Sequence, residues 1–365
     1  MLKVLVVTGV LAGASLIPGL PDLDPSPSPA PPQSAPPSGG QPGAMPAAQS
    51  SPPSAEAERA CDRMAATWGN DRASGAPRAP FRTPGRLVAA LGAGQTGCLR
   101  GGSYTQTEVI VHRRKVTLRS APGERALWRG RIVLEGRRQK LVDLSLDGSY
   151  ARQGLPSPTI NAPEVVISDS DITNSKGICV TARTWNGARP DNIVIQRNRI
   201  HDCGRHPPTN NDHGIYIVDS VGGLIRDNVI FRNADRGVQL YPAAQRITVV
   251  RNTIDGNGSG VIFSNDSSGN VVRDNLISNS VVRWNAESYQ LRGRGNRFES
   301  NCLRPGHSDP GYNENGGVML PSIVAQSGNV VITDEPYRAR AEGDYTPAGK
   351  ECGKRGAAGP ARKPR

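Results

Sequence analysis

The sequence predicts an all-β protein in which short strands wind into a stack of parallel coils, a β-solenoid. The chain of 365 residues contains 42 glycines and 31 prolines but only 4% aromatic residues. This composition favours many turns over helices or a large aromatic core. In addition, the pattern aliphatic–x–x–Asn–x–aliphatic recurs along the chain, and a repeat with a period in the twenties is typical of a solenoid.

The repeat brings one polar residue to the same place in each copy. Successive spacings, counted from Ser170, are 28, 30, 24, 23 and 21 residues. We expect these residues to share one turn, where asparagine tolerates left-handed backbone angles and its amide can bond the asparagine of the next coil. The position is occupied by Asn198, Asn228, Asn252, Asn275 and Asn296, preceded by a serine variant at Ser170 and a degenerate copy around Leu144.

A second short strand follows the first in four copies: GICVTA (177–182), GIYIVD (214–219), GVQLYP (237–242) and GVIFSN (260–265). Alternate side chains of a strand point to opposite faces. Predicted to point inward are Ile178, Val180, Ile215, Ile217, Val238, Leu240, Val261 and Phe263. One outward column holds Cys179, Tyr216, Gln239 and Ile262, and the next holds Thr181, Val218, Tyr241 and Ser264. The residues before the glycines align as Lys176, His213, Arg236 and Ser259, and those before them as Ser175, Asp212, Asp235 and Gly258.

The ends of the chain differ from its body. Residues 1–20 read as a signal peptide, or as a membrane anchor that stays attached, and residues 21–60 as a disordered Pro/Ala/Ser-rich linker. We assign residues 61–349 to the solenoid, with the clearest repeats at 141–300 and a C-terminal cap at 301–349. Residues 350–365 are expected to be a basic, disordered tail. TPGRLVAAL (83–91) predicts a short capping helix with Thr83 as N-cap, Pro84 as first residue, and Leu87, Val88 and Leu91 buried.

Six cysteines in an exported chain predict three disulfides, although 15 pairings exist on paper. We expect neighbours in sequence to pair, which gives Cys61–Cys98, Cys179–Cys203 and Cys302–Cys352.

The N-x-I repeats with their following GI-x-I strands resemble the right-handed parallel β-helix of the pectin-lyase-like superfamily, of the secreted bacterial type. The segment GCLRGGSYTQTEVIVHRRKVTLRSAPGERALWRG (97–130) is similar to the first coils of such proteins. The resemblance covers roughly residues 61–335. It implies a right-handed parallel β-helix, but the same fold carries lyases, hydrolases, epimerases and structural proteins.

The resemblance implies action on an acidic polysaccharide, as a lyase of uronate polymers or a related C5-epimerase. Elimination needs a cation beside the sugar carboxylate, a base for the C5 proton and an acid for the leaving oxygen. Arg236 or Lys176 fits the first role, His213 the second and Tyr216 or Tyr241 the third. Gln239, Arg183, Asp212 and Asp235 complete the expected substrate-binding set. Insertions at 183–191 and 204–212 are expected to wall a trough over Tyr216.

Other interpretations of these residues stay open. His213 can cap a turn, Arg236 can pair with Asp212 or Asp235, and the two tyrosines can be plain surface residues; His201 is better explained as a structural turn histidine. A non-catalytic glycan-binding or envelope protein is the main alternative. A glycoside hydrolase that uses Asp212 and Asp235, about 5 Å apart on successive coils, comes third.

The net charge of +12 favours an anionic partner, and export makes acidic glycan the best candidate. No motif for nucleic acid or nucleotide is found, and we expect a monomer that is secreted or attached to the cell surface. Membrane contact would come only through an uncleaved N-terminal segment. No cofactor is certain, although Asp212, Asp219 and Asp235 could bind calcium loosely.

Overall fold

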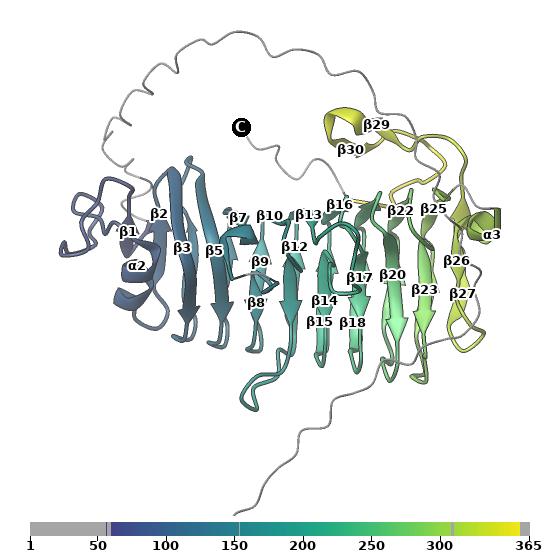
Figure 1. Ribbon diagram of the computed structural model, residues 1–365, viewed down its shortest axis with the longest axis horizontal. Coiled ribbons are helices and arrows are strands. Elements are labelled where there is room, and N and C mark those ends of the chain that lie inside the picture. The colour runs from purple at the N-terminus through teal and green to yellow at the C-terminus, as the bar shows by residue number, and fades with distance from the viewer. Residues whose placement is uncertain (1–55, 57–59, 153, 308–309, 358–365) are drawn as a thin grey trace, which may run out of the picture. The chain divides into compact units, whose positions relative to one another are not determined.

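The protein is described here from a computed structural model that covers residue 56 and residues 60–152, 154–307 and 310–357. The predicted signal or anchor segment, most of the linker and the end of the basic tail lie outside these residues. The predicted parallel solenoid is confirmed, because strands far apart in sequence pair side by side along one axis (Figure 1). Each coil places one strand in a first sheet and then one in each of two columns of a second sheet.

The first sheet has eleven strands. They are β1 (Arg63–Ala65), β2 (Thr96–Leu99), β4 (Thr117–Ser120), β6 (Lys140–Val142), β9 (Val166–Ser168), β12 (Ile193–Gln196), β15 (Val221–Arg226), β18 (Gln245–Val250), β21 (Val271–Arg273), β24 (Arg297–Glu299) and β27 (Ala325–Ser327).

The second sheet has seventeen strands, which begin with the long β3 (Gly102–Val111) and β5 (Ala126–Leu134) and then divide into two columns. The second column contains β7 (Ser145–Asp147), β10 (Asp171–Asn174), β13 (Arg199–Cys203), β16 (Val229–Phe231), β19 (Thr253–Asp255), β22 (Leu276–Ser278), β25 (Cys302–Arg304) and β28 (Val330–Val331). The third column contains β8 (Thr159–Ile160), β11 (Val180–Ala182), β14 (Ile215–Ile217), β17 (Arg236–Leu240), β20 (Ser259–Ser264), β23 (Ala286–Tyr289) and β26 (Val318–Met319).

Helical segments are short. The helix α2 (Pro84–Ala90) has the predicted bounds, with the Thr83 hydroxyl accepting a hydrogen bond from the Arg86 amide. Leu87 and Leu91 lie against Gly97 and Leu118 of the first coils, so the expected buried face of this helix is confirmed. The remaining helical elements are η1 (Gly148–Tyr150), α3 (Pro310–Asn313), η2 (Glu314–Gly316) and η3 (Arg340–Glu342).

The predicted asparagine turn joins the first sheet to the second column. The backbone N–H of each ladder residue donates to the side-chain oxygen of the asparagine one coil later, from Ser170 to Asn198 (3.0 Å) and onward. The Leu144 backbone N–H donates to the Ser170 hydroxyl, so the degenerate copy around Leu144 takes its predicted place before Ser170 in the ladder. The side-chain amides donate along the same ladder and to strand carbonyls below. The side-chain oxygen and amide of each ladder asparagine are thereby paired, which fixes the register of the coils.

One ladder assignment was wrong. Asn296 does not follow Asn275; the amide of Asn275 bonds Asn301, whose amide bonds Asn329. Asn296 bonds Asn270 at a different turn. The reason is positional, because Asn296 precedes strand β24 of the first sheet whereas a ladder asparagine follows such a strand.

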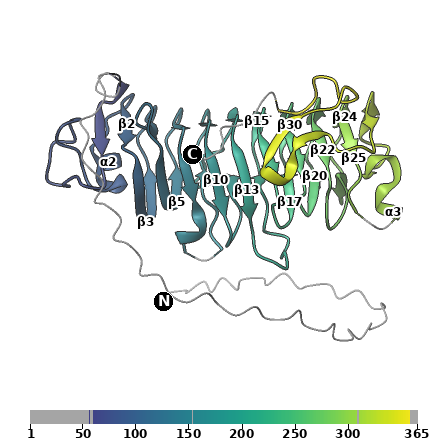
Figure 2. The same cartoon turned by 90° about the horizontal axis from the view of Figure 1, so that it is seen from above.

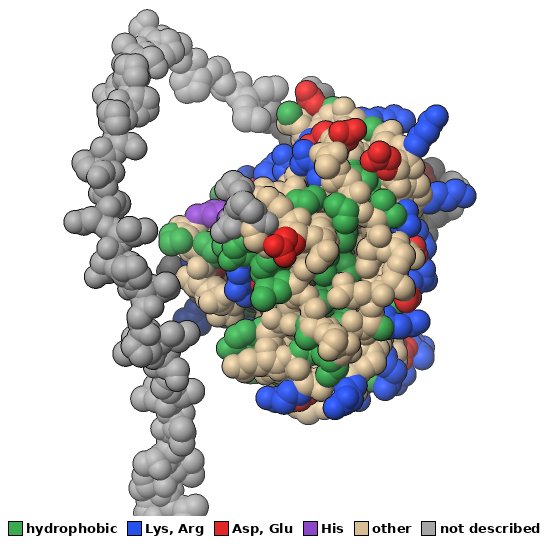
Figure 3. Space-filling model, turned by 90° about the vertical axis from the view of Figure 1, so that its right-hand side faces the viewer, with side chains coloured by type: hydrophobic (Ala, Val, Ile, Leu, Met, Phe, Trp, Pro, Cys, Tyr) green, Lys and Arg blue, Asp and Glu red, His purple; other side chains and the backbone are tan. Residues whose placement is uncertain are grey.

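The coils also run further than the predicted boundary at residue 300. Strands β27 and β28 pair in register with β24 and β25, so strand pairing between coils continues within the range assigned to the cap. This last coil exposes Met319 and Val331, by 59% and 51%. Figure 3 faces that end and shows hydrophobic side chains across it, with Lys and Arg along one edge.

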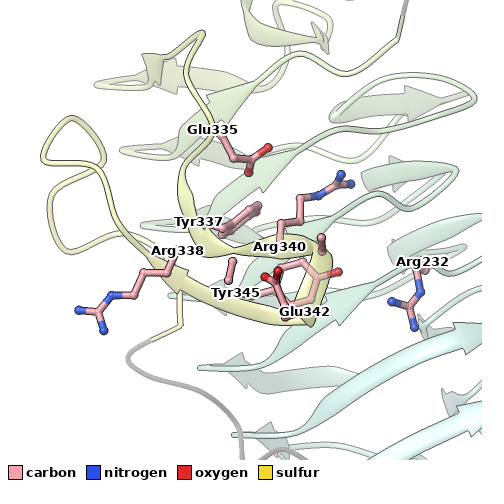
Figure 4. Close-up of a pocket in the computed structure, with 9 residues that line it drawn as sticks. Arg232, Glu335, Tyr337, Arg338, Arg340, Glu342 and Tyr345 are labelled. Carbon is pink, nitrogen blue, oxygen red and sulfur yellow. The ribbon is translucent and has the colours of Figure 1, made fainter.

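Residues 332–357 fold back over the second column as a C-terminal strap. Its hairpin of β29 (Tyr337–Ala339) and β30 (Asp344–Pro347) lies across several coils (Figure 2). Tyr337 and Tyr345 pack with Phe231, and Arg340 pairs with Asp255 at 2.7 Å. A shallow pocket of about 530 Å³ runs along the strap and includes Arg232 (Figure 4). The start of the expected disordered tail belongs to this structure, because Cys352 and Ala357 are buried.

All three predicted disulfides are present. Cys61–Cys98 joins a residue just before β1 to one within the neighbouring strand β2, Cys179–Cys203 joins the start of β11 to the end of β13, and Cys302–Cys352 ties the strap to the coils. Such bonds fit a protein that folds in an oxidising compartment. None of the helices in the described residues is long and apolar enough to cross a membrane.

Candidate functional site

The third column presents one continuous row of outward side chains. Ile215, Val238 and Val261 pair in register and point into the core, as predicted. Between them, Tyr216 pairs with Gln239 and Gln239 with Ile262, so these neighbours on successive coils are also confirmed. The row contains Thr159, Thr181, Tyr216, Gln239, Ile262 and Glu287.

The predicted alignment of the first copy was wrong by two residues. Thr181, and not Cys179, pairs with Tyr216, while Cys179 donates its backbone N–H to the His213 carbonyl and so aligns with Gly214. The cause is a longer turn after Asn174. Lys176 is consequently exposed on that turn and does not join His213 and Arg236.

A cavity of about 370 Å³ opens on this face, and we call it the Tyr216 cavity. The loop 204–212 forms part of its wall, as expected. The loop 183–191 does not, since it borders a separate pocket with Asp219 and Gln245. The residues that line the Tyr216 cavity are Asn210, Asn211, Tyr216, Arg236, Gln239, Tyr241, Ile262, Arg283 and Tyr289.

Two phenols stand side by side in the cavity. The rings of Tyr216 and Tyr241 are nearly parallel, with centroids 6.2 Å apart. Burial raises the pKa of Tyr216 to about 12. The phenol therefore stays protonated at neutral pH, which suits a hydrogen-bond or proton donor and not a base.

The two cavity guanidinium groups belong to a compact ionic cluster. Arg236 lies 2.5 Å from Asp235 and also donates to the Asn210 amide oxygen at 3.0 Å. Arg236 and Arg283 both approach Glu287, at 3.8 and 3.6 Å. The cluster holds two positive and two negative groups, so its formal charge is zero. Because the Arg236 side chain is 7% exposed and that of Arg283 35%, Arg283 is the more accessible cation.

His213 lies beneath the cavity and does not line it. Its side chain is 1% exposed, with Nδ1 3.3 Å from Asp235 and the ring edge against Tyr216. Burial lowers the pKa of His213, so the ring is neutral at pH 7. The expected base therefore has the right charge but lacks the access to substrate that proton abstraction needs.

Asp212 and Asp235 follow each other on successive coils, since the Asp235 amide donates to the Asp212 carbonyl. Neither lines the cavity. Burial raises the pKa of Asp212, but hydrogen bonds from Thr209 and Arg205 outweigh it and leave the pKa below its usual value. Burial also raises the pKa of Asp235, and its contacts with His213 and Arg236 likewise lower it overall. Two ionised carboxylates provide no general acid, which a glycosidase pair requires.

The three aspartates named as loose calcium ligands have different surroundings. Asp212 accepts hydrogen bonds from Thr209, Asp235 pairs with Arg236, and Asp219 borders the other pocket. Within the described ranges, no group of three or more His, Cys, Asp or Glu side chains could hold a metal ion.

The most unusual property of this face is its unpaired polar atoms. Buried polar atoms in proteins nearly always have a hydrogen-bond partner. Several buried atoms on the third-column face have no hydrogen-bond partner among the residues that the structure describes. They include Asn161 Oδ1, Thr181 Oγ1, Arg183 Nε, His213 Nε2, Gln239 Oε1 and Ser264 Oγ.

Sequence reasoning missed Arg283, Glu287 and Tyr289. Glu287 and Tyr289 belong to β23, which pairs with β20 and continues the outward columns from Ile262 and Ser264. The copy was overlooked because AESY lacks the glycine that opens the other second strands. The spacing of 25 residues from Ile262 to Glu287 was the available signal.

Comparisons with known proteins agree with this architecture. Residues 156–303 match a family model described as a right handed beta helix region. A comparison with curated proteins finds no sequence match. Among solved structures, the pectate lyase Pel9A is 11% identical over 75% of this chain and 78% of its own, with a TM-score of 0.53. A xylose complex of XylC is 10% identical over 75% and 86%, with a TM-score of 0.48. A rhamnogalacturonan lyase is 10% identical over 81% and 99%, with a TM-score of 0.47. Identities this low establish the fold alone: the chain is a right-handed parallel β-helix protein.

Proposed function

We propose that this protein binds an acidic polysaccharide in the Tyr216 cavity, outside the cytoplasm and as a monomer. The unpaired buried polar atoms on this face carry the proposal. A buried donor or acceptor without a partner costs about 1–3 kcal/mol, so a face that keeps several of them is built to receive a polar ligand. Sugar hydroxyl groups can both donate and accept, and can therefore pair with amide and hydroxyl atoms such as those of Gln239 and Thr181.

The lining of the cavity matches the parts of a uronate sugar. The Tyr216 and Tyr241 rings offer flat surfaces for a pyranose, and Gln239 offers an amide. Arg283, the accessible cation of the neutral cluster, is placed to meet a carboxylate, which a guanidinium binds well. The protein's net charge of +12 favours polyanions, and a pectate lyase shares the fold.

Cleavage or C5-epimerisation by elimination is the second candidate, and the protonated phenol of Tyr216 favours it. Its raised pKa suits proton donation to a leaving oxygen, while Arg283 neutralises the sugar carboxylate. Two basic groups lie next to the cavity, Glu287 beside Arg236 and neutral His213 beside Tyr216, but neither lines it, so the base of an elimination is not assigned. Glycoside hydrolysis is less well supported, because Asp212 and Asp235 are both held ionised.

One panel of polymers tests these proposals. The full chain would be incubated with alginate, polygalacturonate, a glycosaminoglycan and neutral xylan, each with added calcium and with chelator. We expect binding of at least one acidic polymer, weakened in both Tyr216→Ala and Arg283→Ala, and no binding of xylan. New ultraviolet absorbance from unsaturated uronate identifies elimination, and reducing ends without it identify hydrolysis. Equal binding of xylan, or binding that both substitutions leave intact, contradicts the proposed site.

A further inference from the structure

Polar side chains continue along the third column beyond the Tyr216 cavity, toward the N-terminal coils. Thr159 of β8 pairs with Thr181 of β11, which pairs with Tyr216. The outward row from Thr159 to Ile262 therefore crosses five successive coils. Because neighbouring strands lie about 4.8 Å apart, this row is about 19 Å long.

The N-terminal part of this row has the same unpaired atoms as the cavity. Thr181 Oγ1 and Asn161 Oδ1 have no hydrogen-bond partner within the described chain, although each residue is only 3% exposed. Thr181 lies one coil before Tyr216, and Asn161 follows β8, one coil earlier still. Neither residue lines the cavity. A ligand confined to the cavity would leave both atoms without a partner.

An exposed aromatic side chain lies on the hairpin that follows β11. Trp185 and Ala188 pair across a tight hairpin in which Asn186 and Gly187 have φ values of 47° and 77°. Two successive positive φ angles are what a two-residue hairpin turn requires. Trp185 is 44% exposed, and the Arg183 guanidinium lies 4.9 Å from the centre of its ring. Arg183 directly follows β11, so this pair borders the same outward face as Thr181.

We infer that the ligand path extends from the Tyr216 cavity over Thr181 to the Arg183–Trp185 pair, so that the protein recognises an oligomeric stretch of polysaccharide and not a single sugar. The inference rests on the proposed function, because it assigns further contacts to the same ligand. Sugar hydroxyls pair with Thr181 and Asn161, and a pyranose face packs on Trp185. An exposed tryptophan on a rigid hairpin provides that surface with little loss of conformational entropy on binding.

Length-dependent binding tests the inference. Oligogalacturonates and oligomannuronates from disaccharide to hexasaccharide would be titrated calorimetrically into the full chain and into Trp185→Ala and Thr181→Val. Wild-type affinity should rise with oligomer length. Each substitution should lower hexasaccharide affinity by about threefold to tenfold, the effect of one lost contact, and leave disaccharide affinity unchanged.

Trp68→Ala is the matched control, because Trp68 is exposed to a similar degree, 43%, near the N-terminal end of the coils, and should bind like the wild type. Thermal unfolding of each variant checks that the fold is intact. If Trp185→Ala and Thr181→Val bind the hexasaccharide as the wild type does while Tyr216→Ala does not, the extended path is wrong and the cavity proposal stands. If the wild type binds no oligomer of any length and none of the panel polymers, the proposed function itself fails.

Discussion

The asparagine turn and the Tyr216 face are built from similar polar residues but use them in opposite ways. At the turn, the Asn252 side chain donates to Ile225 and Asn275 and accepts from the backbone and side chain of Asn228. On the face, Gln239 Oε1 has no partner in the described structure. Both residues are at least nine-tenths buried. Burial alone therefore does not distinguish the asparagines of the turn from Gln239, whereas their hydrogen-bond pairing does.

The difference also explains why one region is regular and the other is not. A ladder works only if each coil presents the same residue at the same place, so asparagine recurs from Asn198 to Asn329. A ligand imposes no such repeat. The outward row accordingly changes residue type at each coil, from Thr181 through Tyr216 to Gln239.

The largest loss of stability is expected from a substitution of Asn252. Asn252→Ala removes the acceptor for two Asn228 donors, and it also leaves the Ile225 carbonyl without this donor. We expect the free energy of unfolding to fall by about 3 kcal/mol or more, because each buried unpaired group costs about 1–3 kcal/mol. Gln239→Met, a change of similar size on the face, should alter stability by less than about 1 kcal/mol because no hydrogen bond to its side-chain oxygen is lost. Denaturant titration of both variants measures these changes. Equal losses of stability would contradict the distinction between the paired asparagine and the unpaired glutamine.

In one coil, the disulfide Cys179–Cys203 stands where later coils have the asparagine and the glycine of the repeat. Cys203 takes the place that Asn233 and Asn257 hold in later coils, since its amide donates to Asn233. Cys179 aligns with Gly214. Restoring the repeat with Cys179→Gly and Cys203→Asn should cost less stability than changing both cysteines to alanine.

We expect a difference of about 1–2 kcal/mol between these double variants, the contribution of one or two regained hydrogen bonds. Thermal and denaturant unfolding under non-reducing conditions measure it. Identical stabilities would show that Asn and Gly cannot take over from the disulfide in this coil.

The sequence was informative wherever the chain repeats itself. Period-two alternation placed Ile215 and Val238 in the core and Tyr216 beside Gln239, because strand geometry decides direction. Alignment on glycine failed at Gly177, since Cys179 stands where later copies have that glycine. A repeat pattern contains no information on such a replacement.

The degree of burial of each side chain was the second property that the sequence did not reveal. Alternation predicts which way a side chain points but not what lies above it. His213 was expected at an accessible edge, yet Asp235 and Tyr216 pack against its ring. Arg236 was expected either to meet a sugar carboxylate or to pair with Asp212 or Asp235; it pairs with Asp235, and Glu287, 51 residues later, also approaches it. These contacts depend on which coils become neighbours and on the course of the loops.

A third, smaller effect concerns His201, which lies in the second column beneath the strap. His201 stacks on Phe231, which touches Tyr345 of the strap. Burial lowers the pKa of His201, but hydrogen bonds to Asp171 and Asp202 outweigh it and raise the pKa above its usual value. The groups that face His201 or its two carboxylates are Asp171, Asp202, Arg199, Arg232 and Tyr345.

Since the folded-state pKa is raised, the stabilisation is complete below about pH 6.5, the unfolded value, and is lost as the pH rises through the folded value. His201→Gln should therefore be less stable than the wild type at pH 5.5, and the difference should shrink toward pH 9. Unfolding midpoints measured across this range test the sign. A gap that widens with pH would show that His201 is neutral in the folded protein.

The smallest effect is expected one residue before the ladder. Arg251 has a φ of 51° and pairs with Asp227 at 2.9 Å, with 40% of its side chain exposed. An exposed ion pair contributes about 0.2–1 kcal/mol, and a left-handed non-glycine residue costs about 1 kcal/mol. Arg251→Ala loses the pair and keeps the strain, so it should destabilise slightly. Arg251→Gly loses the pair but relieves the strain, so it should leave stability unchanged within about 0.5 kcal/mol. Arg251 is followed directly by Asn252 of the asparagine ladder. A large loss of stability in Arg251→Gly would therefore mean that the ladder depends on surface charge and not on its buried amides.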